Sequence, residues 1–301
     1  MELVVLGAGQ DAGAPQIGNP QDEGPVLLPS SLGLIDRING ARYLFDATPA
    51  ITEQLTMLDR IEPPSQGLGI DGVFLTHAHM GHYLGLAYFG REAAGADGVP
   101  VYAMPRMAEF LRTNGPWSQL VELGNIEIRT PEPVMDYQHR YKDEIWRPWE
   151  IELADNLAAI ALKVPHRDEY SETVGWVIFS PGGFSFLYLP DLDSWDEFEA
   201  ISGLTLERMI ERSDYAFIDA TFWDDGELGN RDMSEIPHPR VAKVMERLGH
   251  LPDEERAKVQ FIHYNHTNPI RYPDSEESRV VAQAGFGIAR RGDLFCLMGE
   301  P

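Results

Sequence analysis

Short apolar runs of strand length recur along the whole chain, separated by polar loops rich in glycine and proline. Runs of about four to eight residues with turn residues on both sides are typical of buried strands. Asn39-Gly40 lies between two of these runs and is a strong signal for a β-hairpin. The pattern predicts strands over residues 3–7, 31–35, 41–46, 72–75, 99–103, 126–128, 157–164, 174–179, 184–189, 215–219 and 259–263.

Helical spacing of apolar residues appears between these strands. One such stretch opens with Thr48-Pro49, a pair typical of a helix start. A strand, a loop with a polar residue and a helix follow one another several times, which predicts an α/β fold. Because no repeat, low-complexity segment or linker interrupts this order, we expect a single domain over residues 1–301. The predicted helices cover residues 51–58, 105–114 and 241–248.

Polar residues able to bind a metal follow several of the predicted strands. Each lies directly after a strand or within two residues of its end, so a shared sheet edge would bring them together. Histidine and carboxylate without cysteine form a ligand set for zinc, iron or manganese. These residues are His77, His166, Asp191, Asp219 and His263.

The densest group is Thr-His-Ala-His-Met-Gly-His, residues 76–82, directly after the strand at 72–75. His77 and His79 alternate in an extended turn and can face the same way, while His82 begins the next helix. Three imidazoles this close would repel one another if protonated, and a bound cation removes that cost.

The composition narrows the partners. The chain has 48 acidic and 24 basic residues and a formal net charge of −24, which disfavours nucleic acid and anionic membranes. Cys296 is the only cysteine, which excludes an intrachain disulfide and a cysteine-based zinc site. The first residues form no leader or membrane span, so we expect a cytoplasmic protein. The expected partner is a small-molecule substrate. The oligomeric state stays open, a homodimer included.

At these histidines the sequence resembles the metallo-β-lactamase superfamily, whose signature is His-X-His-X-Asp-His after a strand. The resemblance covers nearly the whole chain and looks strongest to the branch of the pyrroloquinoline-quinone (PQQ) biosynthesis protein B. It implies a four-layer αββα sandwich with the site at the edge between the sheets. The segments that carry it are residues 5–16, Ser30-Ser31, Phe45-Asp46-Ala47-Thr48-Pro49, residues 76–82, residues 219–224 and residues 261–269.

The resemblance also implies a ligand arrangement. His77, His79 and His166 would hold a first metal, His82 and His263 a second, and Asp191 would bridge the two. The implied cofactor is Zn²⁺, as one or two ions, with Fe²⁺ or Mn²⁺ as alternatives. Asp46 is expected to support a ligating histidine by a hydrogen bond.

Two departures from the family pattern bear on mechanism. Gly81 stands where the hydrolases carry an aspartate that ligates the second metal, so another acid must substitute or the affinity for that metal falls. Asp219 is the candidate substitute; alternatively it caps its strand or holds a histidine from outside the ligand set. The cysteines that bind a structural metal early in the quinone-biosynthesis proteins are absent from residues 18–28.

We therefore expect a metal-dependent hydrolase acting on an ester, lactone, lactam or phosphoester, with Asp191, His238 and Asp219 as catalytic candidates. His238 could donate a proton or contact substrate, or be a plain loop residue. The alternative is an iron-dependent oxygenase, and a third reading is a binding protein without catalysis. No Gly-X-Ser-X-Gly motif or dinucleotide fingerprint is present. Loops at residues 18–28, 131–150 and 224–240 would shape the substrate pocket.

Overall fold

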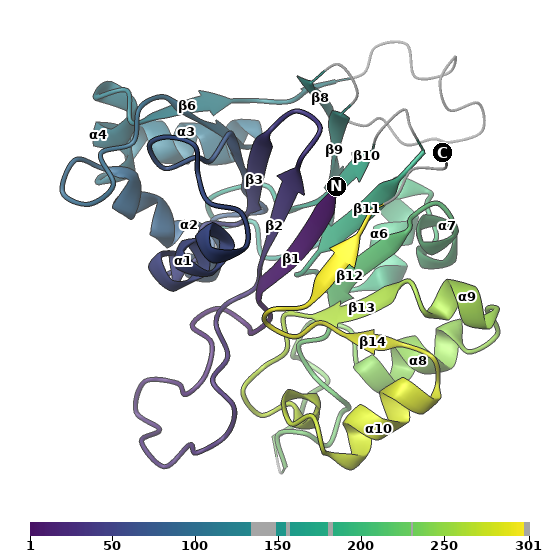
Figure 1. The fold of residues 1–301 in the computed structure, drawn as a ribbon. Helices are drawn as coiled ribbons and strands as arrows, with labels where there is room; N and C mark the ends of the chain where they lie inside the picture. The colour runs from purple at the N-terminus through teal and green to yellow at the C-terminus, as the bar shows by residue number, and fades with distance from the viewer. Residues whose placement is uncertain (134–148, 155–156, 180–182, 230, 298–301) are drawn as a thin grey trace.

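Two β-sheets face each other in the computed structural model, which describes residues 1–133, 149–154, 157–179, 183–229 and 231–297. In the first sheet the strands follow the order β15-β1-β2-β3-β4-β5-β6, and in the second β14-β13-β12-β11-β10-β9-β8-β7. Figure 1 shows the two sheets side by side with helices on their outer faces. The αββα sandwich expected from the sequence is confirmed.

The first sheet is built from the N-terminal half and the last strand. The hairpin predicted at Asn39-Gly40 joins β2 to β3, while β3 to β6 run parallel. Its strands are β1 (Glu2–Gly7), β2 (Ser31–Asp36), β3 (Ala41–Phe45), β4 (Gly72–Phe74), β5 (Val99–Tyr102), β6 (Ile126–Arg129) and β15 (Leu294–Cys296). The helices α1 (Ile51–Ile61), α2 (Met80–Tyr83), η1 (Leu84–Phe89), α3 (Pro105–Thr113) and α4 (Trp117–Glu122) belong to this half.

The second sheet is built from the C-terminal half of the chain. From β11 to β14 its strands are parallel, so their carboxyl ends lie at one edge. They are β7 (Glu132–Pro133), β8 (Trp149–Ala154), β9 (Leu157–Lys163), β10 (Val174–Phe179), β11 (Ser185–Leu189), β12 (Tyr215–Asp219), β13 (Val259–Ile262) and β14 (Gly287–Ile288). With them come α6 (Trp195–Ser202), α7 (Leu206–Glu211), α8 (Val241–Leu248), α9 (Asp253–Arg256), η2 (Pro269–Arg271) and α10 (Glu276–Gln283).

Both faces of the central strands are buried, which explains why the sequence shows continuous apolar runs instead of alternation. Leu3 and Val5 of β1 face the core between the sheets. Val4 and Leu6 of the same strand pack on the other side, in the core shared with α1, α3 and α4. The sheets meet through aromatic side chains: Phe74 lies 5.0 Å, centroid to centroid, from Trp176 of the opposite sheet.

The predicted strands and helices are observed, with ends that shift by at most one residue, except that α1 continues three residues beyond the predicted end at residue 58. One exception matters for the site, because α2 begins at Met80 and His79 is its N-cap, so His82 lies inside the helix. Most of the connection between the strands predicted at 174–179 and 184–189, and most of the loop at 131–150, lie outside the described residues. In the part of the chain that the structure describes, no helix has the length and apolar character needed to cross a membrane.

Candidate metal centre

The sequence-predicted ligands converge at the edge between the two sheets. His77, His79 and His82 follow β4 of the first sheet, while the others follow β9, β11 and β13 of the second. They form two overlapping groups, in each of which one ligand atom per residue lies within 4.8 Å of all the others. The groups are His77, His79, His166 and Asp191, and His82, Asp191 and His263.

Asp191 belongs to both groups and lies at their centre. Its Oδ2 faces four imidazole Nε2 atoms, although it lies within ordinary hydrogen-bond distance of only some of them. The distances are 3.3 Å to His166, 3.4 Å to His77, 3.8 Å to His263 and 3.9 Å to His82.

The donor atoms of this cluster fit a metal ion. The Nε2 atoms of His77, His82 and His263 and the Oδ1 atom of Asp191 are buried and take no hydrogen bond. Their side chains are at most 4% exposed. An unsatisfied buried polar group costs about 1–3 kcal/mol, so four in one place need an explanation. A cation bound among them would satisfy all four, and imidazole with carboxylate suits Zn²⁺, Fe²⁺ or Mn²⁺.

The opposite ring nitrogens of these histidines are held by neighbouring side chains. This contact fixes each imidazole so that its Nε2 points at the cluster, an arrangement common around metal-binding histidines. The pairs are His77 Nδ1 with Thr76 Oγ1 at 3.0 Å, His82 Nδ1 with Asp46 Oδ2 at 2.7 Å, His166 Nδ1 with Asp193 Oδ1 at 2.7 Å, and His263 Nδ1 with Thr221 Oγ1 at 3.1 Å.

His79 is the most exposed member of the cluster and is oriented differently. Its Nδ1 lies 3.1 Å from His166 Nε2, and its Nε2 lies 3.2 Å from Glu169 Oε2. Nδ1 is therefore the nitrogen that faces the cluster, and Glu169 holds the ring from the solvent side.

Asp46 supports the cluster through a hydrogen bond to His82, as expected from the sequence. It is fully buried, and its carboxylate accepts hydrogen bonds from the Thr76 amide, the His82 ring and the Tyr188 hydroxyl. Its backbone is left-handed, with φ of 60°, as is that of His263 at 64°. Left-handed backbone is uncommon outside glycine and often marks functional sites.

Electrostatic effects keep two of the ligands, Asp191 and His77, in the forms that bind a metal. Burial would raise the pKa of Asp191, but His263, His166 and His238 hold it well below its usual range. Burial and the neighbouring charge of His82 lower the pKa of His77 well below normal. At neutral pH, Asp191 is a carboxylate and His77 is neutral.

Asp219 and His238 form a contact of their own beside the cluster. Asp219 Oδ2 lies 2.8 Å from His238 Nδ1 and also accepts the Leu192 amide at 3.1 Å, while Oδ1 accepts the Thr221 amide at 2.7 Å. Asp219 groups with Asp191 and His238, not with His82 and His263. Since both of its oxygens already accept protein hydrogen bonds, the geometry favours the role of a positioning residue over that of a substitute ligand.

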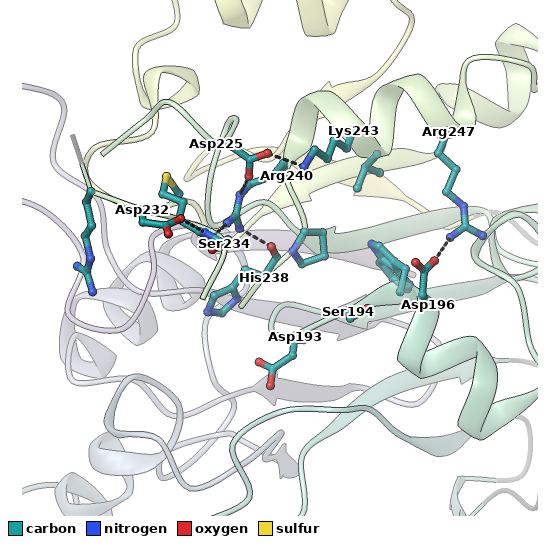
Figure 2. A pocket seen from close by; sticks show the side chains of 15 residues that line it. Asp193, Ser194, Asp196, Asp225, Asp232, Ser234, His238, Arg240, Lys243 and Arg247 are labelled. Atoms are coloured by element: carbon teal, nitrogen blue, oxygen red, sulfur yellow. Dashed lines mark hydrogen bonds and ion pairs between the residues drawn. The ribbon is translucent and has the colours of Figure 1, made fainter. Parts of the chain in front are cut away.

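A cavity of about 620 Å³ opens next to His238 and Asp193. Figure 2 shows these two side chains near each other, with Lys243 and Arg247 of α8 across the pocket. Arg240 donates to the carbonyl oxygens of Pro237 and His238, which fixes the loop that carries His238. That backbone is left-handed, with φ of 81° at His238.

Apart from Asp46, sequence reasoning missed the residues that orient the ligands. Asp193 lies two positions after Asp191, and this alternate spacing was a usable signal that both carboxylates reach one face. Thr221 and Thr76 gave no such signal, because threonine beside a strand end is common and their contacts depend on the fold.

Comparisons with known proteins show the family and the fold. The family model described as beta-lactamase superfamily domain matches residues 41–264. Coenzyme PQQ synthesis protein B of Acinetobacter baylyi is 23% identical over 338 residues, covering 98% of this chain and 99% of that protein. The protein of the same name from Klebsiella pneumoniae strain 342 is 24% identical over 326 residues, covering 97% of each.

A solved structure with the same fold is zinc-bound PqqB from Methylobacterium extorquens, with a TM-score of 0.73 and 19% identity, covering 99% of this chain and 100% of that one. A diphosphatase of the PhnP family has a TM-score of 0.62 and 21% identity, covering 98% of this chain and 96% of the other. At these identities the solved structures establish the shared fold.

Proposed function

The chain belongs to the metallo-β-lactamase superfamily, and we propose from its site that it is a metal-dependent hydrolase of a small molecule. The observation that carries the proposal is a set of four buried ligand atoms without hydrogen-bond partners, Asp191 Oδ1 and the Nε2 atoms of His77, His82 and His263. The bond cleaved would be an ester, lactone, lactam or phosphoester.

The proposed ligand arrangement has two parts. His77, His79 and His166 would hold one ion, His82 and His263 the other, and Asp191 would bridge them. The two overlapping groups that share Asp191 support this division. The proposed metal is Zn²⁺, one or two ions, with Fe²⁺ or Mn²⁺ as alternatives. A divalent ion bound there would supply Lewis acidity, which polarises the scissile group and makes water nucleophilic near neutral pH.

His238 is the proposed proton donor to the leaving atom, which is the oxygen of an ester, lactone or phosphoester or the nitrogen of a lactam. It lies where the cluster meets the pocket, 3.3 Å from Asp191 Oδ1, and Asp219 holds its Nδ1. Burial would lower its pKa, but the charges of Asp219 and Asp191 raise it overall, which favours the protonated ring. During hydrolysis water adds to the carbonyl carbon or to phosphorus and releases a proton to solvent. The bond to the leaving oxygen, or to the nitrogen of a lactam, breaks, and His238 gives its proton to that atom and is reprotonated from solvent.

The substrate would be a small molecule bound in the adjoining cavity. Its volume of about 620 Å³ lies within the about 300–1,000 Å³ of typical ligand pockets. Both acidic and basic side chains line it, among them Asp232, Arg231 and Lys243, so a substrate with polar groups of both kinds fits better than a purely apolar one.

Removal of the central carboxylate tests the proposal. Zinc-loaded Asp191→Asn should lose more activity than the about 10–100-fold typical of a residue outside the ligand set, across a panel of nitrophenyl esters, lactones and phosphodiesters. Glu254→Gln, an exposed substitution on α9, is the matched control and should keep full activity. Unchanged kcat/KM in Asp191→Asn would refute the proposed centre.

The second candidate is an iron-dependent oxygenase, favoured by Gly81. Without the carboxylate that hydrolases carry there, a single iron held by histidines and Asp191 is an alternative arrangement. It predicts that the zinc form is inactive and that activity requires Fe²⁺ with oxygen uptake, which an oxygen electrode measures. Hydrolysis by the anaerobic zinc form would rule this candidate out.

A further inference from the structure

Gly81 is packed against the loop that follows β1, and a side chain does not fit there. A Cβ atom built on Gly81 would lie 2.5 Å from the Cα of Asp11 and 2.9 Å from its carbonyl oxygen. Cβ atoms do not approach backbone this closely without displacing it. The space from which an aspartate at residue 81 would extend is therefore filled by the backbone of another aspartate.

This loop is firmly tied to the site. Gly9 forms bridges to Pro29 and to Tyr264, the residue after His263. The Gln10 amide donates to the Tyr264 carbonyl at 3.1 Å, and the Tyr264 amide donates to the Ala8 carbonyl at 3.0 Å. These contacts hold the chain around Asp11 against the segment that delivers His263.

Asp11 itself is held in a special conformation. Its φ of 38° lies in the left-handed region, which aspartate tolerates better than most residues. The Gly13 amide closes the turn by donating to the Gln10 carbonyl at 2.7 Å. Among the described residues no group donates a hydrogen bond to the Asp11 side chain, so its carboxylate is available to a ligand.

Asp11 lies against the residue that precedes His82, and its loop is bonded to Tyr264, the residue that follows His263. His82 and His263 both have a buried Nε2 atom without a partner, and both belong to one group with Asp191.

We propose that Asp11 supplies the carboxylate ligand of the second metal ion, in place of the aspartate that Gly81 lacks. The inference rests on the metal centre of the proposed function and names a residue from a different part of the chain. Asp219 is less suited to this role, since its oxygens accept amides and hold His238. Glycine at residue 81 is then required, because it lets the Asp11 backbone approach α2.

Metal binding tests the assignment without recourse to turnover. The experiment uses the metal-free full chain titrated with Zn²⁺ against a chelating indicator, together with elemental analysis of ions per chain. Asp11→Asn and Asp11→Gly both tolerate the left-handed backbone, and glycine removes the side chain altogether. Glu23→Gln removes one charge from the same loop at an exposed position and is the control.

We expect two ions in the wild type and in Glu23→Gln. In both Asp11 variants the affinity of the weaker site for zinc should fall at least tenfold, while that of the stronger site is unchanged. Tenfold is the smallest loss typical of residues that only support a metal ligand, so the loss of a ligand should be at least as large. Cobalt(II) substitution should show the loss of one set of visible bands. Two ions with wild-type affinity in both variants would overturn the role of Asp11 and leave the proposed centre standing. Fewer than two ions in the wild type would overturn the two-ion centre and this inference together.

Discussion

Asp46→Asn should weaken metal binding by altering which nitrogen of His82 carries a proton. Every partner of the buried Asp46 carboxylate donates to it: the Thr76 amide and hydroxyl to Oδ1, and the His82 ring and the Tyr188 hydroxyl to Oδ2. In asparagine an NH₂ group replaces either Oδ1 or Oδ2. This NH₂ group is a donor, and at both positions it faces another donor, the Thr76 amide or the His82 ring. The group that can adapt is His82, by moving its proton to Nε2, the atom that faces Asp191.

The magnitude follows from these contacts. A change in a residue that orients a metal ligand typically costs about 10–100-fold in affinity, which corresponds to about 1.4–2.7 kcal/mol. Leaving one buried donor unsatisfied costs a further about 1–3 kcal/mol of folding stability. Asparagine tolerates the left-handed backbone of residue 46, so the backbone itself should not change.

Zinc competition titrations and urea unfolding of the metal-free protein measure the two effects separately. Asp36→Asn is the matched control, because Asp36 is equally buried and accepts only donors, the amides of Ile38 and Asn39 and the Asn39 side chain, away from the cluster. It should lose stability and keep its zinc affinity. If Asp46→Asn also binds both ions with wild-type constants, the argument from the His82 proton is refuted.

Three further predictions concern pH, packing at residue 81 and the core. Burial lowers the pKa of His166, yet the charges of Asp191 and Asp193 raise it to about 10 from an ordinary 6.5. The stability that this histidine gives the metal-free protein is therefore complete below pH about 6.5 and lost as the pH rises through about 10. The free energy of unfolding in urea should depend less on pH in His166→Gln than in the wild type, and the same pH dependence in both would contradict this. Gly81→Ala should lose about 1–3 kcal/mol from overpacking, whereas Gly115→Ala, where a Cβ meets open space, should not; equal melting temperatures would count against the close approach. Phe74→Ala should cost about 3–5 kcal/mol, because the ring packs between the sheets; a loss below 1 kcal/mol in urea unfolding would be inconsistent with that packing.

Much of the fold and of the ligand cluster was predictable from the sequence, because both follow from local patterns. Apolar runs mark the strands, and a polar residue at the end of a parallel strand lies at the edge of the sheet, beside the ends of the neighbouring strands. His166, Asp191 and His263 were found in this way, and the parallel pairing of β11, β12 and β13 accounts for the last two.

What the sequence did not reveal depends on contacts between distant segments. Asp11 lies in a glycine-rich loop and resembles any turn residue until the fold brings it against Gly81. The same holds for Thr221, which reaches His263 from another strand end. Asp219 illustrates the opposite case: the sequence drew attention to it, but only the hydrogen bonds of both oxygens separate a positioning role from that of a ligand.

The ligand cluster draws on both halves of the chain, since His77, His79 and His82 belong to the first sheet and the remaining donors to the second. An ion held there would be a reversible cross-link in a chain whose single cysteine rules out an internal disulfide. Ligands that bind only the folded state stabilise it by mass action. The supply of metal would then set not only the chemistry of the protein but also its lifetime against proteolysis, so that a starved cell would clear the empty protein faster than the loaded one.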